Sequence, residues 1–191
     1  MINKRRAIPL IVVIFLVCIV LALGLYHVFT SFDIKRSEDI VGAINVTTTG
    51  SSENIPLATS NNGDFSGIFF QEAEYNKLII LKKNWMTGRY SCWGTASTLS
   101  TVGTYQSVDS HNRIVVVYGN NSDICATSYM ISNGDDTFMK NGLQDYILDI
   151  YIIQSDDSRA FTGELYKHEE DINYSCSIIT NQHLGGSHMV Y

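Results

Sequence analysis

The sequence predicts an all-β domain, either an antiparallel sandwich or a lipocalin-like barrel, carried on a single N-terminal transmembrane helix. Two observations predict the domain. Short runs rich in Ile, Val and Tyr recur along the chain, and clusters of Gly, Asn and Asp separate them. Regularly spaced short strands with such turns are typical of sandwiches and barrels. A third observation, a long apolar stretch near the N-terminus, predicts the helix.

The N-terminal segment predicts a membrane anchor. Three cations at residues 4–6 precede an uncharged, mostly apolar stretch, residues 7–29. About 20 apolar residues cross a hydrocarbon core of about 30 Å, and cations in front of such a segment favour a cytoplasmic N-terminus. A cleaved signal peptide is the alternative, since Ala22-Leu23-Gly24 meets the small-residue rule for cleavage. The expected topology is a cytoplasmic tail (1–6), an anchor (7–29) and an outer segment.

The outer segment is expected to divide into a stalk, residues 30–64, and a β-domain, residues 65–191. The stalk is rich in Thr, Ser, Asn and Gly over residues 47–64, which is typical of linkers. The strands expected in the domain are KLIILKK (77–83), RIVVVYG (113–119), ICATSYMIS (124–132), YILDIYIIQ (146–154), AFTGELYKH (160–168) and INYSCSIIT (172–180).

Charge and motifs exclude several functions. From residue 45 onward, 8 Lys and Arg face 16 Asp and Glu, a net charge of −8 with His neutral. Such a domain repels nucleic acid, so no direct nucleic-acid binding is expected. The sequence contains no nucleophile elbow, zinc-protease, phosphate-loop or dinucleotide motif. We therefore predict a protein that is not an enzyme, without catalytic, metal-binding or cofactor-binding residues.

Three cysteines lie in the outer segment: Cys92, Cys125 and Cys176. In an oxidising compartment, cysteines of a small β-domain are commonly disulfide-bonded. Cys92 and Cys176 share the triplet Tyr-Ser-Cys, with a tyrosine two positions earlier on the same face of its strand. The predicted bond is therefore Cys92–Cys176, which would stabilise the domain by about 4–5 kcal/mol in the chain-entropy model. Pairings of Cys125 with either of the other two stay open.

A few other side chains are candidates for function. His168 precedes three acidic residues, which favour the imidazolium form, so it is a candidate pH sensor as well as a solvated turn residue. The aromatic residues Trp85, Tyr90, Trp93 and Tyr174 are candidates for an apolar cavity or an interface, since small barrels hold one ligand.

The basic N-terminus, the anchor and the stalk are followed by GRYSCWGTAST, RIVVVYG, YILDIYIIQSDDSRAFTGEL and NYSCSI. Together they resemble the FidL-like inner-membrane proteins of enteric bacteria and the similar accessory proteins of Yersinia fimbrial operons. The resemblance covers roughly residues 85–180. Cys92 and Cys176 match the disulfide of that family, and Cys125 has no place in its pattern.

The resemblance implies a single-pass inner-membrane protein with a periplasmic C-terminal domain. Its partner would be a membrane-anchored winged-helix transcription regulator, in the manner of the ToxR–ToxS pairs. The accessory protein would stabilise the periplasmic domain of the regulator and share a β-barrel with it, and the pair would respond to a small amphipathic ligand or to acid.

The predicted function is therefore that of a non-enzymatic accessory protein for such a regulator. The alternative is an autonomous, lipocalin-like module for small-ligand binding or envelope protection. A hydrolase too divergent to show its motif is a third hypothesis. An exposed sheet edge would favour the first function, because unpaired edges invite strand addition.

Overall fold

Strands make up most of the chain beyond residue 57. The structure is a computed structural model. It describes the backbone of residues 4–48, 54–109, 112–154, 159–169 and 172–182, and the side chains of residues 12–26, 30–48, 54–109, 112–154 and 159–167. Within these residues two helices precede eleven strands, which confirms the all-β prediction for the domain.

The helices are α1 (Lys4–Phe29) and α2 (Ser37–Thr47). The strands are β1 (Ala58–Asn62), β2 (Phe65–Glu72), β3 (Tyr75–Lys83), β4 (Tyr90–Thr98), β5 (Val102–Asp109), β6 (Asn112–Asn120), β7 (Ser128–Ser132), β8 (Thr137–Asn141), β9 (Tyr146–Gln154), β10 (Thr162–Glu169) and β11 (Ile172–Gln182). All six expected strands are present, as β3, β6, β7, β9, β10 and β11. β7 begins later than expected because Asn121 holds the preceding loop through two side-chain hydrogen bonds, each of 2.9 Å, to the backbone of Ala126.

The strands form two sheets. One has the order β1-β2-β3-β4, and the other has the order β8-β7-β10-β11-β5-β6-β9. The ladders are antiparallel with one exception, the parallel pair β11–β5, which runs from Ile179↔Gly103 to Gln182↔Gln106. The sequence predicts purely antiparallel sheets, whereas the larger sheet contains this one parallel pair. The direction of β11 is set by its hairpin with β10, and β5 meets it from a distant part of the chain.

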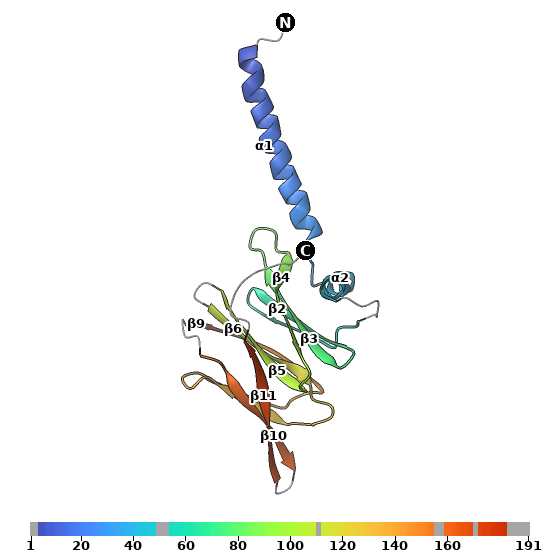
Figure 1. Ribbon diagram of the computed structural model, residues 1–191, viewed down its shortest axis with the longest axis vertical. Coiled ribbons are helices and arrows are strands. Elements are labelled where there is room, and N and C mark those ends of the chain that lie inside the picture. The colour runs from blue at the N-terminus through green and yellow to red at the C-terminus, as the bar shows by residue number, and fades with distance from the viewer. Residues whose placement is uncertain (1–3, 49–53, 110–111, 155–158, 170–171, 183–191) are drawn as a thin grey trace.

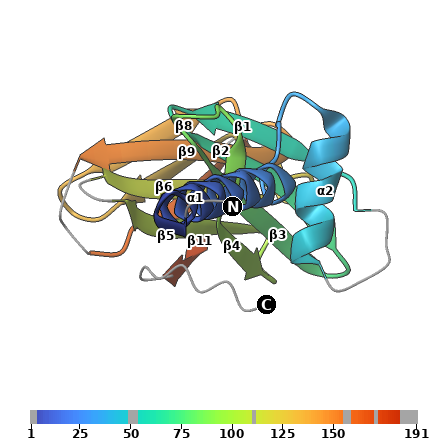
Figure 2. The same ribbon diagram turned by 90° about the horizontal axis from the view of Figure 1, so that it is seen from above.

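The two sheets pack face to face, and the larger sheet also folds back on itself. The four-stranded sheet covers β5, β6 and β9 and buries an apolar cluster that includes Phe69, Tyr105 and Tyr118. On the other face of those strands a second cluster includes Tyr129 and Phe161, so β7 and the segment before β10 curl over β6 and β9. Figure 2 shows α2 on the right, the four-stranded sheet beside it and β5, β6 and β9 on the left.

Strand β6 lies at the centre of these layers, which explains its unbroken apolar run. Ile114, Val116 and Tyr118 face the four-stranded sheet, whereas Val115 and Val117 face the curled half of the larger sheet. All five side chains are fully buried. A strand covered on both faces reads as a continuous hydrophobic run because neither face needs polar residues.

Helix α1 projects away from the β-domain, with the N-terminus at its far end (Figure 1). Its described apolar side chains are exposed, as with Phe15 (65%) and Val20 (67%). Among the described side chains, which cover residues 12–26 of α1, no helical segment is long and apolar enough to cross a membrane. The helix ends at Phe29, just before Ser31 and Phe32 make contact with the β-domain.

Residues 30–64 are more structured than the sequence predicts. Helix α2 lies in the expected stalk and buries Ala43 and Ile44 in an apolar cluster with Ile79 and Leu81 of β3. Strand β1 pairs with β2 over its full length. Strand β1 (ATSNN) has no apolar face of its own, and α2 has only a short apolar stripe of Ile40, Ala43 and Ile44. Both depend on contacts with β2 and β3, and the folded unit therefore begins before residue 65.

Candidate functional site

Strand β4, one of the two outer strands of the four-stranded sheet, has an open side among the residues that the structure describes. On its other side β4 pairs with β3 at every residue except Trp93. On the open side, the described residues supply one short bridge. In it, the N–H of Phe32 donates to the carbonyl of Tyr90 at 2.7 Å, and the N–H of Tyr90 donates back at 2.8 Å. An edge strand of this kind is a template for a further strand. β4 is therefore the candidate partner-binding site.

A bulge divides β4 into two parts. The register between β3 and β4 shifts at Trp93, which has no opposing residue on β3. Beyond this bulge Ala96 is buried, whereas Thr95 and Ser97 are exposed. Bulges bend a strand and disturb its pairing. A partner strand is therefore expected on the regular part of the edge, residues 94–98, where it would meet small hydroxyl side chains.

Trp93 is held in place by its neighbours rather than being open to a ligand. Its indole N–H donates to the hydroxyl of Ser107 at 3.1 Å, and its ring meets Phe65 edge-on at a centroid distance of 6.0 Å. The ammonium of Lys82 lies 4.6 Å from the Trp93 ring centroid while it bonds to Asp109 at 2.6 Å. The residue is therefore a packed part of the rim between the sheets.

The three aromatic candidates whose side chains are described, Trp85, Tyr90 and Trp93, do not come together as one site. Tyr90 is buried against α2, and this burial raises the pKa of its hydroxyl. Trp85 lies on the β3–β4 hairpin, and 87% of it is exposed. Tyr174 lies on β11, and its side chain is outside the described residues. The predicted aromatic cavity is therefore not formed by Trp85, Tyr90 and Trp93.

Among the side chains that the structure describes, Cys92 has a free thiol. Burial raises the pKa of this thiol, which keeps it in the less nucleophilic, protonated form. Cys176 lies on β11, in the other sheet, and its side chain is outside the described residues. The bond between Cys92 and Cys176 therefore stays a prediction.

The remaining cysteine and the candidate pH sensor lie apart from β4. Cys125 is exposed, has a φ of 54° and donates its thiol hydrogen to the carbonyl of Ser122 at 3.1 Å. His168 lies in β10, opposite Asn173 of β11, and its side chain is outside the described residues. The backbone thus places His168 within a strand pair rather than in a turn, and its pH-sensing role stays a prediction.

A polar cluster that the sequence analysis missed lies where β7 and β8 approach β9. The hydroxyl of Tyr129 donates to Asp149 Oδ2 at 2.8 Å and lies 2.6 Å from the hydroxyl of Tyr151. Lys140 pairs with the other carboxylate oxygen of Asp149. Lys140 and Asp149 also line a cleft of about 230 Å³. No local pattern reveals this cluster, because its members come from three separate strands.

This cluster predicts a loss of stability at alkaline pH. Burial, the bond with Tyr151 and the charge of Asp149 raise the pKa of Tyr129 above its ordinary value of 10.0. The native state then holds this proton more tightly than the unfolded state. The stability that the Tyr129 hydroxyl contributes is fully present below pH 10.0. It is lost as the pH rises further, and the free energy of unfolding then falls by up to about 1.4 kcal/mol per pH unit.

Above the ordinary tyrosine pKa, the free energy of unfolding of the Tyr129→Phe variant should therefore fall less steeply with pH than that of the wild type. The difference is about the slope that one proton contributes, because phenylalanine has no proton to release. Urea unfolding of both proteins, in a pH series below and above the ordinary tyrosine pKa, measures the slope. Tyr75→Phe, which removes a tyrosine hydroxyl from a side chain that is 43% exposed and lies outside this cluster, is the matched control. Equal slopes in the wild type and Tyr129→Phe would contradict the prediction.

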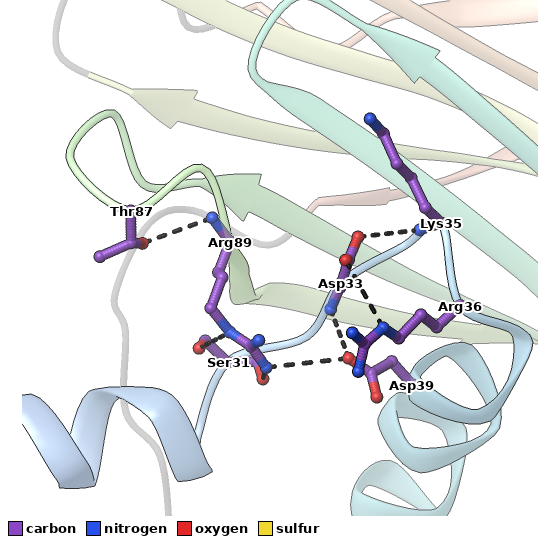
Figure 3. A network of polar contacts seen from close by, with 7 residues as sticks. All are labelled: Ser31, Asp33, Lys35, Arg36, Asp39, Thr87 and Arg89. Carbon is purple, nitrogen blue, oxygen red and sulfur yellow. Dashed lines mark hydrogen bonds and ion pairs between the residues drawn. The ribbon is translucent and has the colours of Figure 1, made fainter.

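Arg89 ties the end of α1 to the β3–β4 hairpin (Figure 3). Its Nε donates to the hydroxyl of Ser31 at 2.7 Å, and its Nη2 donates to the Ser31 carbonyl at 2.6 Å. Asp39 of α2 lies 3.7 Å from the same guanidinium and accepts the N–H of Asp33 at 2.7 Å. The outer end of α1, the start of α2 and the hairpin that opens β4 therefore form one connected unit, called here the junction.

These features suit recognition of another protein chain by its backbone. The open edge of β4 carries Thr95 and Ser97 outward, and it begins at the junction. Burial raises the pKa of the Cys92 thiol, and the carboxylate of Asp149 is paired with Lys140. Comparison of the chain with protein-family models, with curated proteins and with solved structures finds no match.

Proposed function

We propose that the protein is a non-enzymatic accessory protein of the inner membrane. Its partner is the periplasmic domain of a membrane-anchored winged-helix transcription regulator, which it binds and stabilises. The observation that carries the proposal is the open edge of β4, where Phe32 already forms a two-bond bridge with Tyr90. A strand of the regulator would extend this edge and combine the two domains into one larger sheet.

The anchor in this proposal is α1. At about 1.5 Å per residue, a helix of 26 residues is about 39 Å long, against a hydrocarbon core of about 30 Å. The apolar stretch of the sequence, residues 7–29, continues on both sides of the described side chains at 12–26, all of which are exposed. Three cations at residues 4–6 favour a cytoplasmic N-terminus, and the β-domain would then lie in the periplasm.

Strand addition at β4 also explains how the accessory protein would stabilise its partner. Main-chain hydrogen bonds give affinity for an added strand, and side-chain contacts give specificity for its sequence. Pairing covers the exposed edges of both domains, which otherwise invite aggregation. The acidic charge of the domain further favours a protein partner over nucleic acid.

The autonomous ligand-binding alternative has less support. The interior of the curled sheet is filled by the fully buried side chains of Tyr129, Ile131 and Phe161. The cleft beside Lys140 and Asp149 is open at the rim, and the charges of these two residues neutralise each other. An autonomous module would need an apolar cavity, and the side chains of Tyr129, Ile131 and Phe161 occupy the described interior of the curled sheet instead.

A photo-crosslinking amino acid at Thr95, in full-length protein expressed in its own cells, tests the proposal. Thr95 is exposed on the open edge, so the expected product is an adduct with a second membrane protein that has a cytoplasmic winged-helix domain. The matched control is the same amino acid at Met139, which is 62% exposed on β8, the edge of the other sheet. Mass spectrometry identifies the adducts. An adduct at Met139 but not at Thr95, or no adduct at normal abundance, would contradict the proposal.

A further inference from the structure

The hairpin between β3 and β4 presents two large apolar side chains to solvent. Trp85 is 87% exposed, the highest fraction among the large apolar residues that the structure describes, and Met86 is 73% exposed. Both belong to the loop of residues 84–89, called here the hairpin tip. Tryptophan combines a large apolar ring with a polar N–H and is enriched where membrane meets water. Methionine is flexible and adapts to irregular apolar surroundings.

The backbone of the hairpin tip is bonded within the tip itself. The side-chain oxygen of Asn84 accepts the N–H groups of Met86 and Thr87 at 2.9 and 3.2 Å. The carbonyl of Asn84 accepts the N–H of Gly88 at 2.8 Å, and the N–H of Asn84 donates to the carbonyl of Arg89, also at 2.8 Å. Entry of backbone into lipid is costly when its polar groups lack partners. The Asn84 bonds lower that cost and hold the loop in one shape.

The junction fixes the hairpin tip next to the outer end of α1. Arg89, the last residue of the tip, bonds to Ser31, two residues beyond the end of the helix. Phe32 and Tyr90 extend the connection by two backbone hydrogen bonds. Figure 1 shows the hairpin loop reaching the level of the last turn of α1.

The end of the hairpin tip carries no charge, since residues 85–88 are uncharged. Charges of both signs surround it: the exposed lysines Lys35 and Lys83 lie near Asp33, Asp39 and Asp64. An uncharged end with two large apolar side chains is the arrangement expected of a loop at a lipid surface.

We infer that the hairpin tip is a second membrane contact, in which Trp85 and Met86 enter the headgroup region of the outer leaflet beside α1. This inference rests on the membrane anchor of the proposed function. Two contacts held by one junction fix the orientation of the domain, which a single helix alone cannot do. The open edge of β4, which starts at the same junction, is then presented at a set height above the membrane.

Tryptophan fluorescence of the full-length protein in vesicles of mixed zwitterionic and anionic phospholipids tests this contact. The chain has two tryptophans, so the emission of the wild type minus that of Trp85→Phe isolates Trp85. We expect blue-shifted emission from Trp85, and a greater loss of intensity with lipids brominated near the headgroup than with lipids brominated near the chain end. Trp93→Phe, which leaves Trp85 alone, provides a second reading of the same signal.

The outcomes separate this inference from the proposed anchor. Protein that floats with the vesicles while Trp85 emits as in water would overturn the hairpin contact and leave the anchor in place. Shielded emission that no brominated lipid quenches would place the hairpin tip against protein and would also overturn the contact. Failure of the protein to float with the vesicles would overturn both the anchor and the contact.

Discussion

Replacing Phe69 by alanine is expected to lower the free energy of unfolding by about 3–5 kcal/mol, the largest effect that we predict. Phe69 is fully buried between the two sheets, and its ring lies 6.3 Å from that of Tyr118 and 6.2 Å from that of Tyr146. The substitution removes this packing and leaves a cavity that rigid strands close only in part. Since small domains are stable by about 5–15 kcal/mol, the variant should unfold well below the temperature of the wild type.

Urea and thermal unfolding followed by circular dichroism measure this change. Phe69→Leu, which keeps most of the apolar volume, should retain much of the stability. Leu99→Ala is the matched surface control, since Leu99 is 65% exposed, and its effect should stay within about 0.5 kcal/mol. A Phe69→Ala protein as stable as the Leu99→Ala protein would show that the two sheets do not pack through this residue.

Replacing Arg89 by alanine is expected to weaken the junction by about 1.5–3 kcal/mol, because hydrogen bonds from a charged donor contribute amounts of this order. The variant loses both bonds to Ser31 and leaves the carboxylate of Asp39 without this cation. The loss acts where the end of α1 meets the hairpin, so the bridge between Phe32 and Tyr90 should open more often. The core between the sheets, which Arg89 does not touch, should keep its stability.

Hydrogen exchange of the Phe32 and Tyr90 amides in the full-length protein measures this local opening. Faster exchange is expected at these two amides, with unchanged protection in β6. Arg89→Lys is the matched control, since lysine keeps the charge but lacks the planar fork that bonds to two oxygens. It should show an intermediate effect. Unchanged exchange in Arg89→Ala would mean that the backbone bridge holds the junction without the guanidinium.

Local patterns predicted the strands that are buried on one or both faces. RIVVVYG and YILDIYIIQ read as strands because β6 and β9 lie at the centre of the molecule, where burial requires apolar residues at successive positions. Helix α2 and strand β1 escaped prediction because few of their side chains are buried. Their stability comes from contacts with β2 and β3 that are distant in sequence.

The candidate site was predictable only in part. The segment around Trp85, Tyr90 and Trp93 was a candidate because of its aromatic residues. The sequence did not show that Trp85 is exposed, that Tyr90 is buried and that Trp93 packs against its neighbours. The partners of Tyr129 and Arg89 come from other strands and from the segment after α1. Such contacts depend on how the chain folds back on itself, and no spacing within one segment encodes them.

The sequence by itself determined the apolar N-terminal stretch, the acidic charge, the all-β class and the identity of the central strands. These properties follow from composition and from the short-range alternation of apolar residues, which are local. Only the tertiary structure decided that β4 is an open edge, that β11 joins β5 in parallel and that the hairpin tip lies beside the end of α1. Strand order arises from pairing between distant segments, whose free energy depends on packing that no single segment contains.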